Sequence, residues 1–411
     1  MVQPSASFRG WQVVAAAFSV LFLTYALQFS YGLFATGMAE ELGWSRADTA
    51  LPYSIYVFFY SALSAVTGRA TDRFGPRRVI SFGAVLLGAG WGLSALATTR
   101  WHLCVSLGVI AAFGTSVSWV PCNATVARWF SRRRGTAVAI ASSGASLGNF
   151  IGPAVAGLAI QALGWRVSLA LFAAVSALLM LVAARYMIRD PESVGQWPDG
   201  DTEPPAAASL SGGYRPREVL ALTDFHLLTL IYFLTWFVLF VPFVHGPALA
   251  RDLMLPEFAG ASLLSAIGVG GTIGRLGAGS ASDRLGRCPT LFAVCALQAV
   301  GLVQFSLASD VTSLWAAAIV FGISYGGGVA LLPALCGDLF GRAHVAGVVG
   351  VLFAIAGSPS AAGPWLAGLL FDLSGSYEST FLGAALLNAV GCVLTGILAY
   401  RLRARRLGNV E

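Results

Sequence analysis

Long apolar runs recur along the whole chain and constrain its fold more than any other feature. Stretches of about 20 apolar residues, broken mainly by Gly, Pro and Ser, follow one another from residue 11 to residue 401. Only 11% of the 411 residues are charged, against roughly 25% in soluble globular domains. A helix of about 20 apolar residues is long enough to cross a lipid bilayer, so the sequence predicts an all-α protein that crosses a membrane many times.

Twelve transmembrane helices are predicted, six before and six after a polar break. They lie near residues 11–36, 47–69, 79–99, 103–127, 135–162, 166–187, 223–249, 259–281, 288–308, 313–339, 345–372 and 379–401. The break at 188–222 is rich in Pro, Gly and Ser and cannot bury apolar surface, so it is predicted to be a linker. The predicted units are an N-terminal six-helix bundle at 1–187, a cytoplasmic linker at 188–222 and a C-terminal six-helix bundle at 223–411.

The distribution of the basic residues predicts the orientation. All 25 are arginines, and if the amino terminus is cytoplasmic, 20 of them lie in cytoplasmic segments and four in outer loops. Arginine is enriched on the cytoplasmic side of membrane proteins. We therefore expect a multi-pass protein of the inner (cell) membrane with both termini in the cytoplasm. This topology accounts for the net charge of +6, and binding of nucleic acid is not expected.

The two halves of the sequence share an internal repeat. GRATDRFG at residues 68–75 recurs 211 residues later as GSASDRLG at 279–286, and the Gly-Pro pair at 152–153 recurs at 363–364 with the same offset. Parallel repeats of this kind build many secondary transporters. The sequence therefore predicts two bundles related by a parallel repeat.

The repeated element after predicted helices 2 and 8 resembles the signature of the major facilitator superfamily, and the resemblance covers the whole chain. Within that superfamily, FSYGLF (29–34), LGWSRADT (42–49), ARWFSRRRGTAVAIASSGASLG (127–148) and an arginine in helix 8 are similar to the bacterial monocarboxylate and oxalate:formate carriers, relatives of the animal monocarboxylate transporters. The resemblance implies the major facilitator fold and a carrier, not an enzyme. The residues themselves show no metal cluster, nucleotide loop or lysine, so no cofactor is expected.

Arg275 is the most informative single residue. It lies within predicted helix 8, eight residues before Asp283 and thus about 12 Å along a helix from the repeated element. An arginine at this depth costs about 2.5–3.5 kcal/mol, so it should face a partner or a watery cavity. The acidic residues near the helices all fall at helix ends, which disfavours a structural ion pair. The guanidinium fork fits a carboxylate, and the resemblance implies the same use of this arginine.

His245 lies toward the outer end of predicted helix 7. A neutral imidazole can hydrogen-bond an anion, and it could bind a co-transported proton near physiological pH. The residues alone are equally consistent with a structural role for His245 at the helix end. The resemblance favours function, because bacterial relatives often carry a histidine at this place.

Other polar side chains at the depth of Arg275 are predicted to line the same cavity. They are Tyr31, Asn123, Thr125, Tyr325, Ser358 and Ser360. Each alone is better explained as a contact between helices, since small and polar residues are enriched there in membranes. As a set they fit a central cavity, and Asn123 and Tyr325 are the favoured members.

The repeated element is predicted to act in gating and not in substrate binding. Its gating residues are Asp72, Arg73, Gly75, Asp283 and Arg284. A carboxylate at such a helix end can pair with loop arginines or cap a neighbouring helix, which locks one face until the bundles rock apart.

We therefore predict a monomeric secondary transporter for a small, lactate- or pyruvate-like monocarboxylate, moving with a proton by alternating access in the lipid bilayer. The lysine and aspartate of the animal carriers correspond here to Ala35 and Gly271, which leaves His245 or the substrate to carry the proton. The alternatives are an anion exchanger, a drug-type efflux carrier, which would need an acidic cavity residue for cations, and a non-transporting sensor, which should carry a longer tail than RLRARRLGNVE.

Overall fold

The computed structural model describes residues 8–130, 133–201, 213–341 and 345–408, and these are mostly helical. The first half contains α1 (Gly10–Phe29), α2 (Tyr31–Leu42), α3 (Arg46–Phe74), α4 (Pro76–Ser94), α5 (Arg100–Leu103), η1 (Cys104–Ala111), α6 (Ala112–Ser116), α7 (Trp119–Trp129) and α8 (Arg134–Ala184). The second half contains α9 (Thr223–Phe237), α10 (Val241–Asp252), α11 (Phe258–Leu285), α12 (Arg287–Ser306), α13 (Val311–Phe340), α14 (Val345–Leu352), η5 (Phe353–Gly357), α15 (Ser358–Ser360), α16 (Ala362–Ser374) and α17 (Glu378–Gly408).

Within the described residues, these elements form twelve rods of membrane-spanning length, as predicted. Eight stretches are both long and apolar enough to cross a membrane, and one of them, Thr136–Ala184, is two helices joined at the non-helical Gly164. The three remaining rods are α3, α4 and α11. The helices α3 and α11 are less apolar because their C-terminal ends carry the charged and small residues of the repeated element.

The internal repeat marks the same backbone feature in both halves. Gly75 ends α3 with φ of 83°, and Gly286 ends α11 with φ of 94°. Side chains rarely adopt this region, so glycine is favoured at both positions. Each glycine leads directly into the next helix, which turns the chain back on itself. The predicted parallel repeat is thus visible in the backbone.

The glycines of α8 allow close packing against α1. A Cβ atom at Gly144 would lie 2.3 Å from the carbonyl oxygen of Phe18, and one at Gly148 would lie 2.3 Å from that of Phe22. Only glycine lets the two backbones approach this closely. The spacing of four between these glycines therefore serves close packing of α8 on α1.

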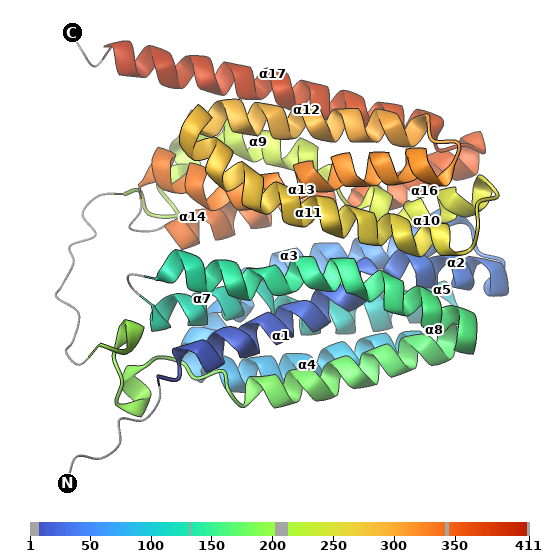
Figure 1. Cartoon of the computed structure of the whole chain (residues 1–411), viewed down its shortest axis with the longest axis horizontal. Coiled ribbons are helices and arrows are strands. Elements are labelled where there is room, and N and C mark those ends of the chain that lie inside the picture. The colour runs from blue at the N-terminus through green and yellow to red at the C-terminus, as the bar shows by residue number, and fades with distance from the viewer. Residues whose placement is uncertain (1–7, 131–132, 202–212, 342–344, 409–411) are drawn as a thin grey trace.

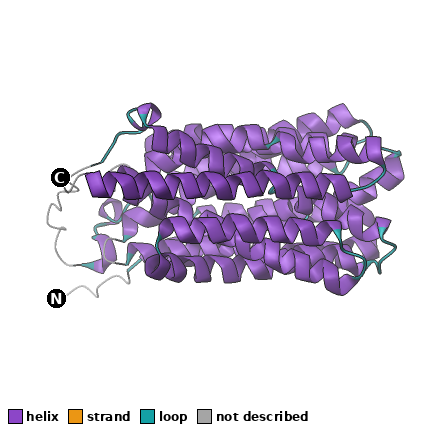
Figure 2. Ribbon diagram, turned by 90° about the horizontal axis from the view of Figure 1, so that it is seen from above, coloured by secondary structure: helices purple, strands orange, loops and turns teal. Residues whose placement is uncertain are grey.

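The two halves form two bundles that lie one above the other (Figure 1), and the same division is seen from above (Figure 2). The start of α1 and the end of α17 lie at the same end of the molecule, here called the termini end. Contacts between the bundles come from α8 against α11, α3 against α16 and α2 against α10. The central site is therefore expected between these pairs of helices.

Charged groups join the bundles at the opposite end, here called the far end. The Asp372 carboxylate of α16 accepts the backbone N–H groups of Arg46 and Ala47, at 3.1 and 3.0 Å, and so caps the start of α3. The Arg46 side chain reaches Asp252 of α10 at 2.8 Å, and Arg251 bonds Glu40 of α2. A helix end from one bundle is thus stabilised by a carboxylate from the other.

Contacts between the bundles are weaker toward the termini end. The helix α3 packs closely along α16 but touches α14 only lightly. Among the described residues, the ion pairs that join the two bundles all lie at the far end. The molecule is therefore held shut at the far end.

The predicted linker is described over 188–201 and 213–222. It contains three short 3-10 turns, η2 (Glu192–Val194), η3 (Pro198–Gly200) and η4 (Val219–Ala221). The Tyr214 N–H donates to the carbonyl oxygen of Phe340 at 2.8 Å, so this part of the segment is fixed to the end of α13.

We expect Asp372→Asn to loosen the far end. An amide oxygen lacks the charge that favours the positive end of α3, and a loss of about 1 kcal/mol changes the closed population about fivefold. Distances between spin labels at the exposed positions Thr98 and Ser379, measured by pulsed electron resonance, should lengthen. Asp310→Asn is the control, because Asp310 caps a helix within its own bundle. Equal distance distributions in the variant and the unchanged protein would contradict the role of Asp372.

Candidate substrate-binding site

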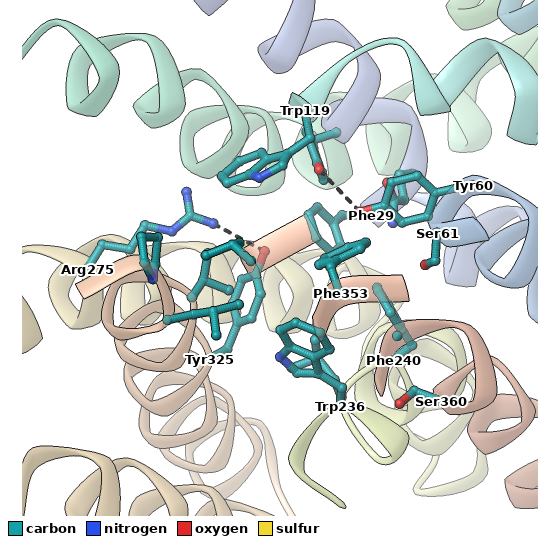
Figure 3. Close-up of a pocket in the computed structure, with 18 residues that line it drawn as sticks. Phe29, Tyr60, Ser61, Trp119, Trp236, Phe240, Arg275, Tyr325, Phe353 and Ser360 are labelled. Atoms are coloured by element: carbon teal, nitrogen blue, oxygen red, sulfur yellow. Dashed lines mark hydrogen bonds between the residues drawn. The ribbon is translucent and has the colours of Figure 1, made fainter. Parts of the chain in front are cut away.

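A cavity of about 100 Å³ lies between the two bundles, beside Arg275. One water takes about 10–15 Å³ of such space, so the cavity has room for a small organic molecule. Its lining comes from helices of both bundles (Figure 3) and consists of Tyr25, Gln28, Phe29, Tyr60, Ser61, Trp119, Trp236, Leu239, Phe240, Arg275, Tyr325, Val329, Leu332, Pro333, Val349, Phe353, Gly357 and Ser360. Of these 18 residues, Arg275 alone is charged.

The Arg275 guanidinium is half-buried and bonds to both bundles. One terminal nitrogen donates to the Ser146 hydroxyl and, at 3.4 Å, to the Ser142 carbonyl oxygen, both on α8. The other donates to the Tyr325 hydroxyl on α13 at 3.2 Å. Among the described residues, the Nε atom is buried with no partner, and no carboxylate pairs with this guanidinium. Its charge is met by neutral oxygens only.

Asn123 supports this arrangement from behind. Its amide oxygen accepts a bond from the Ser142 hydroxyl at 2.8 Å, and its amide nitrogen donates to the Trp119 carbonyl oxygen at 2.9 Å. Asn123 is not part of the cavity lining in this conformation. It therefore contacts Arg275 only through Ser142, and any effect on a ligand would be one of positioning.

Eight aromatic rings surround the cavity, four from each bundle, and we call them the ring sleeve. The sleeve comprises Tyr25, Phe29, Tyr60 and Trp119 from the first bundle and Trp236, Phe240, Tyr325 and Phe353 from the second. Rings of the two bundles meet directly. The ring centroids of Tyr60 and Phe353 are 6.0 Å apart, and those of Phe29 and Tyr325 are also 6.0 Å apart. Phe353 begins η5, a local π-helical turn of a type often found at functional sites.

Gln28 adds a polar group to this apolar lining. The side chain is 1% exposed, and its amide oxygen accepts a bond from the Tyr56 hydroxyl at 3.5 Å. Its amide nitrogen is buried with no partner among the described residues. Tyr56 lies outside the cavity lining, so this amide joins α1 to α3.

His245 lies outside the cavity lining. Its Nε2 atom lies 2.8 Å from the Pro364 carbonyl oxygen and its Nδ1 atom lies 2.9 Å from the Tyr377 hydroxyl. A carbonyl oxygen can only accept, so Nε2 carries a hydrogen, and Nδ1 of the neutral ring accepts from the tyrosine. The ring is 2% exposed and joins α10 to α16 and to the start of α17.

Among the other predicted cavity residues, Tyr325 and Ser360 belong to the lining, whereas Tyr31, Thr125 and Ser358 do not. The Tyr31 hydroxyl donates to the Thr49 carbonyl oxygen, and the Thr125 hydroxyl donates to that of Pro121. The Ser360 hydroxyl lines the cavity but donates to the carbonyl oxygen of Ala356 at 2.6 Å. In this conformation, therefore, the structure brings Arg275, Tyr325 and Ser360 together at one cavity.

The predicted gating residues lie at the termini end. Gly75 has the positive φ described above, and Arg73 is exposed with its guanidinium carbon 5.1 Å from the centre of the Phe74 ring. Arg284 is also exposed. The side chains of Asp72 and Asp283 lie outside the described residues. Over the part of the chain that is described, no group of three or more His, Cys, Asp or Glu side chains could hold a metal ion.

Two bundles of six helices around one central cavity define a class of membrane transport proteins. The family model described as Major Facilitator Superfamily matches residues 17–357 and 225–410. The chain belongs to this superfamily and is a membrane transporter.

Curated relatives and solved structures agree with this assignment. The chain is 31% identical to human monocarboxylate transporter 11 over 91% of this chain and 79% of the relative, and 28% identical to bovine monocarboxylate transporter 13 over 94% and 89%. It is similar in fold to a crystal structure of the nucleoside transporter NupG, with a TM-score of 0.75, 14% identity and coverage of 94% and 99%. A bacterial homologue of the human lysosomal transporter Spinster, inward-facing and unoccupied, gives a TM-score of 0.69 at 16% identity, with coverage of 97% and 96%.

Three polar residues of the site were not predicted. Ser142 and Ser146 are four positions apart on α8 and so share the face that meets Arg275. Gln28 is an amide in the middle of a long apolar run of the first rod. A polar side chain inside a membrane is costly unless it faces a partner or a cavity. The position of Gln28 within an apolar run could therefore have marked it as a candidate from the sequence alone.

We expect His245→Leu to destabilise the protein. The change leaves the Tyr377 hydroxyl and the Pro364 carbonyl oxygen without their partner, at a cost of about 1–2 kcal/mol. Tyr377→Phe removes only one of the two bonds and should cost less. Thermal unfolding of the purified variants, followed by tryptophan fluorescence, measures both effects. A His245→Leu protein of normal stability that no longer binds ligand would instead place His245 in the binding site.

Proposed function

We propose that this protein is a secondary transporter for a small organic monocarboxylate, for which lactate and pyruvate are the simplest candidates. One observation carries the proposal, namely that Arg275 lies at the central cavity with only neutral partners among the described residues. A guanidinium fork binds a carboxylate with two parallel charge-assisted bonds, which are stronger than bonds to neutral oxygens. The names of the monocarboxylate transporter relatives support the same substrate class.

The proposed transport cycle is alternating access. The bundles 1–187 and 223–411, joined by the segment 188–222, rock about the cavity, and the contacts of Asp372 and Arg46 at the far end break when that end opens. At the termini end, Asp72, Arg73, Gly75, Asp283 and Arg284 form the corresponding gate. The arginine distribution supports a cell membrane location with both termini in the cytoplasm, and the protein acts as a monomer.

Substitution of Arg275 tests the substrate class. Arg275→Lys keeps the charge but loses the planar fork, and Arg275→Ala loses both, so uptake of a labelled carboxylate into proteoliposomes should fall at least about tenfold in each. Arg189→Lys is the control, because Arg189 is an exposed arginine at the termini end paired with Asp190. Normal uptake by Arg275→Ala would remove Arg275 from the site and the proposal with it.

A proton is proposed to accompany the carboxylate. The cavity lining offers no carboxyl group within the described residues, so the substrate or His245 brings the proton. Uptake should therefore accelerate when the outside pH is lowered, and a protonophore should abolish the acceleration. Vesicles without protein measure the background leak of the protonated acid across the bilayer. Uptake that ignores the pH gradient but rises with preloaded internal carboxylate would identify an anion exchanger.

A further inference from the structure

We propose that the site selects monocarboxylates whose apolar body is an aromatic ring, over three-carbon acids. This inference rests on the proposed carboxylate function of Arg275 and narrows its substrate class. Two observations carry it: the ring sleeve and the single charge.

The ring sleeve provides far more apolar surface than a short acid can cover. Eight of the 18 lining residues are aromatic, and five of the others are aliphatic. Each CH₂ group moved from water into such a lining adds about fourfold in affinity. Acetate or lactate has one or two such carbons, whereas a phenyl group has six. A ring can also stack or meet edge-to-face with its neighbours.

The sleeve is built from both bundles, so a ring bound there contacts both. Phe353 lies 6.0 Å from Tyr60 of the first bundle and 5.1 Å from Trp236 of the second, centroid to centroid, and Figure 3 shows these rings around the space beside Arg275 and Tyr325. A carboxylate on Arg275 directs the rest of the ligand into this space. An aromatic body therefore bridges the two bundles.

Calorimetric titration of the purified full-length protein with matched acids tests the ring. The probes are acetate, lactate, phenylacetate and the neutral phenylacetamide. Phenylacetate should bind at least about tenfold more tightly than acetate or lactate. Phe353→Ala should remove most of that advantage and leave the short acids unchanged, while Phe82→Ala, on an exposed face of α4, should change neither.

The outcomes separate this inference from the proposed function. If acetate and lactate bind as tightly as phenylacetate, selection for a ring is wrong while carboxylate transport stands. If phenylacetamide binds as tightly as phenylacetate, or if no acid binds, the carboxylate role of Arg275 fails and the inference fails with it.

Discussion

A permanent positive charge inside a membrane must be met by other groups, and the arrangement around Arg275 follows from that need. The cost of placing arginine there, about 2.5–3.5 kcal/mol, is offset by bonds to Ser146, the Ser142 carbonyl and Tyr325. Two of these partners belong to the first bundle and one to the second. The charge therefore ties the bundles together. Under the proposed function, a carboxylate would offer this guanidinium a stronger partner than any of the three, and binding would be coupled to the contact between the bundles.

Much of the fold could be predicted because its causes are local in sequence. Apolar runs of membrane length gave the twelve rods, and the glycines that end α3 and α11 recur in the sequence at a fixed offset of 211. The spacing of four between Gly144 and Gly148 is also visible in the sequence and is typical of close helix packing, but only the structure shows that the partner is α1. What the sequence could not show is how the bundles meet. The cap that Asp372 gives to the start of α3 joins residues 326 positions apart.

A residue of the site was most readily predicted where it had no local partner, although Ser360 lines the cavity while its hydroxyl bonds the carbonyl oxygen one turn back. Arg275 qualifies because a guanidinium cannot be satisfied by the carbonyl groups of its own helix. Thr125 does not qualify, since its hydroxyl reaches the carbonyl one turn back and needs no cavity. Asn123 falls between these two cases. Its side chain bonds the Trp119 carbonyl oxygen of its own helix and the Ser142 hydroxyl, and it reaches Arg275 only through Ser142. The direction in which each such side chain points depends on its neighbours in space, which no spacing in the sequence reveals.

The two kinds of contact between the bundles suit different tasks. At the far end, Arg46, Asp252 and Asp372 make directional bonds, which are either formed or broken. Around the cavity, the ring sleeve makes apolar contacts, which are nearly indifferent to small changes of angle. In the proposed transport cycle the bundles tilt, and the rings would slide and stay in contact while the charged groups separate completely. A ligand ring held among these rings would stay in apolar surroundings throughout the motion. The motion would begin when the charged contacts at the far end break.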